Sequence, residues 1–248
     1  MTTEYLYRRN VVWEALRAHR RPLERLWLQQ GGKQLEELAA NARRQGLPVE
    51  STSKARLTQL AGDRSHQGVV LEAGPYAYSS VESMLARAAE QQEPPLLLLL
   101  DLLHGPQNIG TLLRTAEACG VHGIIIQDRR APEITPQVVR YSAGAAEHLL
   151  IAQVTNLVRT MEDLKEADVW LVGLDLSPQA QPLGQIDLNM ASGIVVGHEG
   201  RGMRRLVRER CDFLVRIPMR GQVDSLNAAT AGAVLLYATW QARGFIGA

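Results

Sequence analysis

The chain has 248 residues, of which 46% are hydrophobic and 21% charged, and its formal net charge is +1. This composition is ordinary for a globular protein, and no apolar run approaches the roughly 20 residues that a membrane helix needs. The start, "MTTEYLYRRN", lacks the apolar core of a signal peptide, and Cys119 and Cys211 show no metal-binding spacing. We therefore expect a cytoplasmic protein with reduced thiols and no zinc.

The charge is distributed unevenly along the chain. Residues 1–73 carry 12 Lys and Arg against 8 Asp and Glu, a net charge of +4, whereas residues 74–248 carry 15 against 18, a net charge of −3. A basic first third indicates contact with a polyanion, and an Arg-rich solvated surface is the alternative. The candidate contacts are Arg8, Arg9, Arg20, Arg21, Arg43 and Arg44.

The first third of the chain predicts a small mixed domain. Its helices are expected near 10–19, 34–45 and 53–61, and its strands near 24–29 and 67–72. Small residues with Gly74 and Pro75 follow, and then a helical stretch that ends before Pro94 and Pro95. These interruptions divide the chain into three parts, namely a first domain at 1–73, a linker with one helix at 74–93 and a second domain at 94–248.

The second domain alternates between strands and helices. Apolar strands are predicted at 96–101, 123–127, 148–154, 169–175, 193–197 and 212–218. Helices are predicted between most of them, at 108–119, 136–146, 156–167, 202–210 and 225–243. Near-continuous apolar strands that alternate with helices are typical of a parallel sheet covered on both faces. The predicted fold class is therefore α/β.

Three loops at one edge of this sheet hold most of its chemically capable residues. They read "DLLHGPQNIG", "GHEGRGM" and "IPMRGQVDSLN", after the first, fifth and sixth strands. Ligands of parallel sheets bind beyond the carboxyl ends of the strands, so these loops are expected to form a site.

The first loop lacks the G-x-G-x-x-G pattern of dinucleotide-binding folds. Asn108 is predicted to be the N-cap of the helix that follows, and Gly120 its left-handed end. Arg114 lies near the edge of the buried face of that helix. Taken alone, this loop favours a surface arginine.

The second loop contains Gly197, Gly200 and Gly202, which permit positive φ and a close approach of a ligand. Glu199 stands among them, where a carboxylate would repel a phosphate. A cationic or hydroxyl-bearing ligand suits the loop better, and a tight turn with a capping Glu is the alternative. In the third loop, Ser225 is the predicted N-cap of a helix rich in Ala and Gly, which allows another segment to pack closely.

Together, "PQNIGTLLRTAEACG", "IVVGHEGRGM" and "IPMRGQVDSLNAATAGAVLLY" resemble the three motifs of the SpoU family. Members of this family are RNA ribose 2′-O-methyltransferases of the SPOUT superfamily, and they use S-adenosylmethionine. The first domain, with "VVWEAL" and "SHQGVV", is similar to the family's L30e/L7Ae-like α+β domain, which binds the substrate. Stretches such as "GVHGIII" and "EGRGMRRLVRERCD" resemble the branch that methylates a guanosine of bacterial 23S rRNA.

The resemblance implies a C-terminal deep trefoil knot, formed by the helix that begins near Ser225. It also implies a homodimer in which both subunits build each site, no metal, and RNA bound by the first domain. The residues that match the family's catalytic positions are Asn108, Arg114, Glu199, Ser225 and Asn227. Those expected to hold S-adenosylmethionine are Gly197, Glu199, Gly200, Gly202, Ile217 and Leu226.

Arg114 corresponds to the arginine that has been assigned as general base in the family. Because an arginine side chain stays protonated in proteins, we expect it to orient the 2′-hydroxyl and to stabilise the developing alkoxide instead. Two other functions stay open, a tRNA 2′-O-methyltransferase and a catalytically silent RNA-binding assembly factor. The tRNA branch is usually built without this first domain, and a silent module would have no need of the four polar residues Asn108, Arg114, Glu199 and Asn227.

Overall fold

The computed structural model describes residues 2–30, 35–128 and 133–248, which form two compact units. The first unit contains residues 1–77 together with 134–148, and the second contains 78–133 and 149–248. The sequence pattern placed 134–148 in the second domain, whereas this segment packs with the first unit. The chain therefore passes between the units after Ala77, after Glu133 and after His148.

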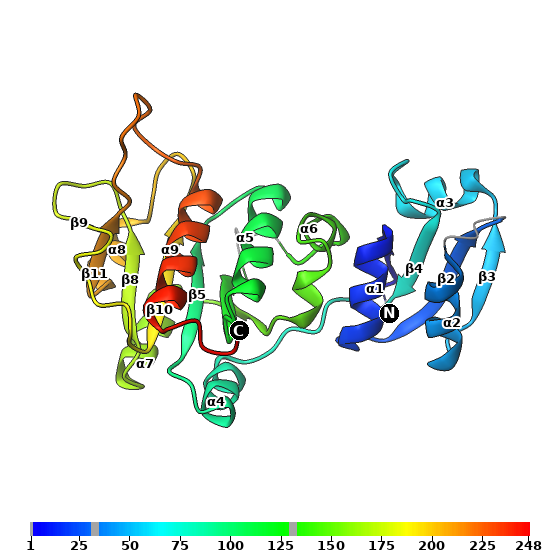
Figure 1. Cartoon of the computed structure of the whole chain (residues 1–248), viewed down its shortest axis with the longest axis horizontal. Coiled ribbons are helices and arrows are strands. Elements are labelled where there is room, and N and C mark those ends of the chain that lie inside the picture. The colour runs from blue at the N-terminus through cyan, green and yellow to red at the C-terminus, as the bar shows by residue number, and fades with distance from the viewer. Residues whose placement is uncertain (1, 31–34, 129–132) are drawn as a thin grey trace. The chain divides into compact units, whose positions relative to one another are not determined.

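The first unit is a four-stranded sheet with flanking helices (Figure 1). Its elements are β1 (Glu4–Tyr7), α1 (Arg9–Ala18), β2 (Leu23–Gln29), α2 (Glu36–Arg44), β3 (Val49–Thr52), α3 (Lys54–Ala61), β4 (Val69–Ala73), α6 (Pro136–Tyr141) and the 3₁₀ turn η2 (Ala145–His148). The strand order is β1-β4-β2-β3, antiparallel except for the β2–β3 pair. Residue 34, where the second helix was expected to begin, lies outside the described residues. Strands β1 and β3 were not predicted, because four residues are too few to establish an alternating pattern.

A buried ion pair joins the two chain segments of the first unit. Arg21 donates through Nε and Nη2 to both carboxylate oxygens of Glu147, at 3.1 and 2.7 Å, and neither side chain is exposed. Burial raises the pKa of Glu147, and the Arg21 charge opposes this shift. Arg21 was expected to bind RNA, and this prediction is wrong, because its guanidinium is enclosed and already paired.

The predicted helix at 136–146 is broken into α6 and η2. Ala143 and Gly144 between them have positive φ values of 55° and 95°. A Cβ at Gly144 would lie 2.7 Å from Cβ of Glu14 on α1, so only glycine allows this approach. The break is thus set by packing within the first unit, which the helical periodicity of the segment does not reveal.

The second unit is a seven-stranded sheet in which every adjacent pair is parallel, in the order β7-β6-β5-β10-β8-β11-β9. The strands are β5 (Leu96–Asp101), β6 (Gly123–Gln127), β7 (Ile151–Val154), β8 (Trp170–Leu174), β9 (Gln181–Pro182), β10 (Ser192–Gly197) and β11 (Phe213–Arg216). The helices are α4 (Val81–Gln91), α5 (Pro106–Ala118), α7 (Leu157–Glu166), α8 (Arg205–Arg210) and α9 (Ala228–Ala242). The predicted α/β fold with a parallel sheet is confirmed.

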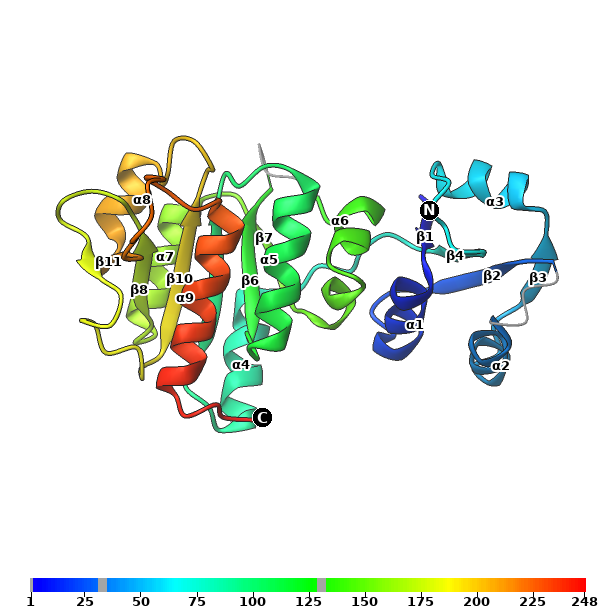
Figure 2. The same cartoon turned by 45° about the horizontal axis from the view of Figure 1, so that its top comes forward.

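Apolar side chains of the central strands fill both faces of this sheet. Val195 of β10 lies in a buried cluster with α4, α7 and α8, whereas the next residue, Val196, faces α9. Helices α5 and α9 lie side by side over that second face (Figure 2). Gly232 of α9 makes the contact possible, because a Cβ there would lie 2.9 Å from Leu112 of α5. No helix in the described part of the chain is long and apolar enough to cross a membrane.

Candidate functional site

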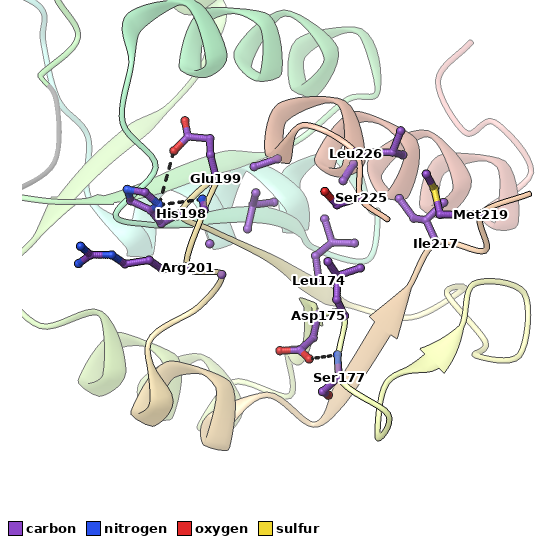
Figure 3. Close-up of a pocket in the computed structure, with 17 residues that line it drawn as sticks. Leu174, Asp175, Ser177, His198, Glu199, Arg201, Ile217, Met219, Ser225 and Leu226 are labelled. Atoms are coloured by element: carbon purple, nitrogen blue, oxygen red, sulfur yellow. Dashed lines mark hydrogen bonds and ion pairs between the residues drawn. The ribbon is translucent and has the colours of Figure 1, made fainter. Parts of the chain in front are cut away.

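A pocket of about 420 Å³ lies beyond the carboxyl ends of β8 and β10, against the start of α9 (Figure 3). All six residues predicted to hold a cofactor line it, and so does Ser225. The loop after β8 also lines it, and the sequence analysis left that loop out. Its contributing residues are Asp175, Leu176 and Ser177, which follow the pocket-lining Leu174 at the end of β8. The strand-end rule that selected the other loops applies equally to "VWLVGLD", so this signal was present in the sequence.

The glycine loop after β10 closes on itself. His198 and Gly202 exchange two backbone hydrogen bonds of 3.1 and 2.9 Å, and Gly202 has a φ of 66°. A Cβ at Gly197 would lie 2.4 Å from the backbone of Gly202 and Met203, whereas one at Gly200 would have its nearest neighbour at 4.0 Å. Gly197 is therefore required by the loop's own backbone, and the expected close approach of a ligand stays a prediction. Positive φ is confirmed only at Gly202.

The end of the glycine loop is anchored to β5. The carboxylate of Asp101, which is fully buried, accepts hydrogen bonds from the backbone N–H and the Nε of Arg204, each at 2.7 Å. Arg204 also donates through Nη2 to Oε1 of Gln127, at 3.0 Å. Since Asp101 and Gln127 end β5 and β6, Arg204 ties the loop that carries Glu199 to two neighbouring strands.

Three polar side chains from the three predicted loops form one hydrogen-bonded chain. Asn227 donates through Nδ2 to Oδ1 of Asn108, at 3.2 Å, and Asn108 donates through Nδ2 to Oε1 of Glu199, at 2.6 Å. Asn227 is also the N-cap of α9, since its Oδ1 accepts from the backbone N–H groups of Ala229 and Thr230. The cap fixes which way the Asn227 amide points, and through it the Asn108 amide presents N–H to the carboxylate.

Two predicted caps are therefore wrong. Helix α5 begins at Pro106 after Gly105, which has a φ of 86°, so Asn108 lies inside the first turn and its side chain is free to reach Glu199. Asn227, and not Ser225, caps α9. Gly120 does end α5 in the left-handed conformation, with a φ of 68°.

Two histidine side chains lie near Glu199 and the glycine loop. His198 lines the pocket, and its Nδ1 accepts the backbone N–H of Gly200 at 3.0 Å. The same nitrogen lies 4.0 Å from Oε2 of Glu199. The His104 ring meets the His198 ring edge to face, with 5.5 Å between the centroids. His104 was not singled out in the sequence, because an exposed loop histidine has no distinctive local pattern.

Asp175 is the second carboxylate of the pocket. Its Oδ1 accepts the backbone N–H of Ser177 at 2.6 Å, and its Oδ2 lies 3.1 Å from Nε of Arg208 on α8. These contacts hold the carboxylate at the carboxyl end of β8. The pocket thus presents the carboxylates of Asp175 and Glu199 together with the guanidinium of Arg201.

Within a single copy of the protein, Arg114 does not contact the hydrogen-bonded series Asn227–Asn108–Glu199. It is exposed on α5, does not line the pocket, and has no hydrogen bond or ion pair among the described residues. Of the candidate polyanion contacts in the first unit, Arg9, Arg43 and Arg44 are exposed. Arg20 donates to the backbone of Glu147 and Arg8 to Ser65, so these two are partly engaged.

Neither cysteine has the surroundings of a reactive thiol. Burial raises the pKa of Cys119 to about 11 and, with help from nearby carboxylates, that of Cys211 to about 12. Within residues 2–30, 35–128 and 133–248, no group of three or more His, Cys, Asp or Glu is placed to hold a metal ion.

Two family models match consecutive parts of the chain. The model of the SpoU rRNA Methylase family matches residues 95–237, and a model for RNA 2′-O ribose methyltransferase substrate binding matches residues 5–79. The chain is 39% identical over 246 residues to the putative TrmH family tRNA/rRNA methyltransferase YacO of Bacillus subtilis (strain 168), with 98% of each chain covered.

Solved structures share the fold over nearly the whole chain. The SpoU methyltransferase AviRb from Streptomyces viridochromogenes, in complex with the cofactor AdoMet, has a TM-score of 0.80 at 24% identity, covering 99% of this chain and 92% of that one. An RNA 2′-O ribose methyltransferase has a TM-score of 0.77 at 25% identity, covering 97% and 89%. From the methylase model, which spans more than half of the chain, and from the close relative, we conclude that the chain belongs to the SpoU family of RNA methylases.

Proposed function

We propose that the protein transfers a methyl group from S-adenosylmethionine to a ribose 2′-hydroxyl of ribosomal RNA, at a guanosine of 23S rRNA. The observation that carries the proposal is the pocket at the strand ends, with the Asn227–Asn108–Glu199 chain beside it. The methylase and substrate-binding family models support the reaction class and the RNA substrate.

The pocket suits S-adenosylmethionine in shape and charge. Leu174, Ile217 and Leu226 offer apolar surface to an adenine ring, and the carboxylates of Asp175 and Glu199 favour the positive charges of a sulfonium and an ammonium group. Arg201 also lines the pocket, and it is the carboxylate of Glu199 within the glycine loop that disfavours a phosphate-bearing cofactor there. When bound, the cofactor supplies an electrophilic methyl carbon, and the loops hold the acceptor oxygen in line with it.

The hydrogen bonds from Asn227 to Asn108 and from Asn108 to Glu199 hold the Glu199 carboxylate in one orientation. Because Asn108 donates to Oε1 of Glu199, the second oxygen of the carboxylate is left to orient the ribose hydroxyl. Arg114 stabilises negative charge that develops on the 2′-oxygen. Since Arg114 is exposed and away from the pocket of its own chain, we propose that it acts in the pocket of a second copy.

We also propose that the protein is a homodimer and that its C-terminal part forms a trefoil knot. The outer faces of α5 and α9 carry Arg114 and the exposed apolar residues Val234 and Tyr237, which are 38% and 51% exposed. A second copy packed there would cover them, and an obligate interface of this kind buries about 2,000 Å² or more. Sedimentation of a fully active monomer would contradict this assembly.

The first unit is proposed to bind the RNA. Its exposed arginines Arg9, Arg43 and Arg44 are candidates for pairing with phosphates. Replacing them with Gln should lower the log–log salt slope of RNA binding by about 0.7–0.9 for each phosphate that the protein no longer neutralises. These substitutions are a better test than deletion of the domain, because deletion would uncover residues 134–148, which pack with it. An unchanged slope would contradict a role of these arginines in pairing with phosphates.

The function is tested by mapping 2′-O-methylation across total RNA from cells with and without the protein, and by methyl transfer to the purified RNA fractions. We expect one ribosomal position to lack its methyl group when the protein is absent. A missing tRNA methyl group would favour the tRNA alternative. RNA binding without any methyl transfer, and without heat of binding for S-adenosylhomocysteine in calorimetry, would favour a silent assembly factor.

A further inference from the structure

The end of the glycine loop and helix α8 after it contain five arginines, within residues 201–210. Each of the last four forms an ion pair with a carboxylate in the described part of the chain. The pairs are Arg204 with Asp101, Arg205 with Glu209, Arg208 with Asp175 and Arg210 with Glu162. These contacts lie within the second unit, so four of the five charges have partners without any external ligand.

Arg201 is the exception among the five. Its side chain is exposed and forms no hydrogen bond or ion pair with any of the described residues. It is also the one Lys or Arg among the described residues that line the pocket. Glu199, two residues earlier, does not neutralise it, because the Glu199 carboxylate is bonded to Asn108 instead. The pocket therefore carries an unpaired cation next to Glu199.

Arg201 and Glu199 both belong to one closed turn. The backbone groups of His198 and Gly202 exchange two hydrogen bonds, which enclose the three residues between them. Figure 3 shows the Glu199 and Arg201 side chains on either side of His198, with Arg201 extending away from the apolar wall that contains Ile217. The cation thus has a set place relative to the carboxylate, on the side of the pocket opposite to the surface that suits the cofactor.

An RNA acceptor brings an anion to such a place. In an internal nucleotide the 3′-phosphate is attached to C3′, the carbon next to the one that carries the 2′-hydroxyl. A 2′-hydroxyl that Glu199 orients therefore arrives together with a phosphate nearby. Arginine suits this anion well, because its planar guanidinium donates two parallel hydrogen bonds to a pair of phosphate oxygens.

We propose that Arg201 binds the RNA phosphate on the 3′ side of the acceptor ribose, an inference that rests on the proposed methyltransferase function. The contact positions the ribose so that its 2′-hydroxyl meets Glu199, and it favours a ribose inside an RNA strand over a free nucleoside. Since the phosphate is unchanged by methyl transfer, Arg201 binds the substrate and the transition state alike.

The test is binding and single-turnover methylation of ribosomal RNA purified from cells that lack the protein, with wild type, Arg201→Gln and Arg201→Lys. Arg205→Gln is the matched control, because it removes an equal charge four residues away that is already paired with Glu209. We expect Arg201→Gln to lower the RNA affinity by about tenfold and the log–log salt slope by about 0.7–0.9. Arg201→Lys should keep the slope and recover part of the affinity.

Two further readouts separate a phosphate contact from other roles. At saturating RNA the single-turnover rate of Arg201→Gln should stay within about threefold of wild type, because the contact is the same in the ground state and the transition state. The affinity for S-adenosylhomocysteine, measured by calorimetry, should be unchanged in all variants.

An unchanged RNA affinity or salt slope in Arg201→Gln would overturn the proposal. Equal losses in Arg205→Gln would also overturn it, because a positive charge anywhere on this surface would then attract RNA equally well. Weaker binding of S-adenosylhomocysteine would do the same, since Arg201 would then hold the carboxylate of the cofactor. Failure of the proposed function is distinct from these results, because the wild-type protein itself would then transfer no methyl group to any RNA.

Discussion

Replacing Asp101 with Asn should both destabilise the protein and loosen the glycine loop. The Asp101 carboxylate is fully buried and accepts two hydrogen bonds of 2.7 Å from Arg204, one from the backbone N–H and one from Nε. An asparagine has the same size but only one oxygen. Its –NH₂ group would face one of these donors, so at least one hydrogen bond becomes a clash between two N–H groups.

The size of the effect follows from these two bonds. A hydrogen bond to a charged group contributes about 1.5–3 kcal/mol, and leaving a buried group unsatisfied costs a comparable amount. The Arg204 side chain is 44% exposed, so water compensates part of the loss on the guanidinium side. We therefore expect the free energy of unfolding to fall by about 2–4 kcal/mol.

Urea unfolding gives this free energy, and calorimetry with S-adenosylhomocysteine reports on the loop. The affinity should fall at least tenfold, because Glu199 and the pocket-lining backbone are no longer held to β5. Arg205→Ala is the matched control, since Arg205 lies next in the chain but forms an exposed ion pair with Glu209, which contributes under about 0.5 kcal/mol. If Asp101→Asn behaves like this control in both measurements, the anchor has no role in holding the loop.

Three further predictions concern the glycine loop, Arg114 and pH. Gly197→Ala should abolish binding of S-adenosylhomocysteine and lower the unfolding temperature, because its Cβ would lie 2.4 Å from loop backbone, whereas Gly200→Ala should leave the unfolding temperature unchanged; equal effects in a thermal unfolding assay would contradict the backbone clash. Arg114→Ala should slow single-turnover methylation by about 10²–10³-fold with little effect on cofactor binding, and Arg114→Lys should recover part of the rate; an unaffected Ala variant would make Arg114 a surface residue. Burial lowers the pKa of both His66 and His122 below the usual 6.5. As the pH falls below about 6.5, the unfolded chain therefore binds more protons than the folded protein. The free energy of unfolding is thus highest above this pH and decreases below it. The difference in unfolding free energy between wild type and His66→Gln should accordingly shrink from pH 7 to pH 5, and a growing difference would reverse the sign we assign.

The sequence by itself determined the sheet and the location of the candidate site. Strand β5 reads "LLLLLD" and β10 "SGIVVG", and such runs require apolar surroundings on both faces, which a parallel sheet with helices on each side provides. Because all its strands point the same way, their carboxyl ends meet at one edge. The order of elements was therefore enough to bring the loops with Asn108, Glu199 and Asn227 together.

Only the tertiary structure decided how those residues contact one another. Asn108 and Glu199 are 91 residues apart, and Asn108 and Asn227 are 119 apart, so no local sequence pattern shows that their side chains form one series of hydrogen bonds. Local signals even pointed to the wrong caps, because Asn and Ser are both good N-cap residues and the sequence cannot show which one has another partner.

Burial was the other property that the sequence left open. Arg21 belongs to a basic stretch, and its sequence does not distinguish it from the exposed arginines nearby. In the structure its side chain is buried and paired with Glu147. Glu147 in turn lies in a segment whose helical pattern gives no sign that it packs with the first unit. Side-chain charge and periodicity are local properties of a chain, whereas exposure and pairing depend on which distant segments pack together, and that is decided only by the folded structure.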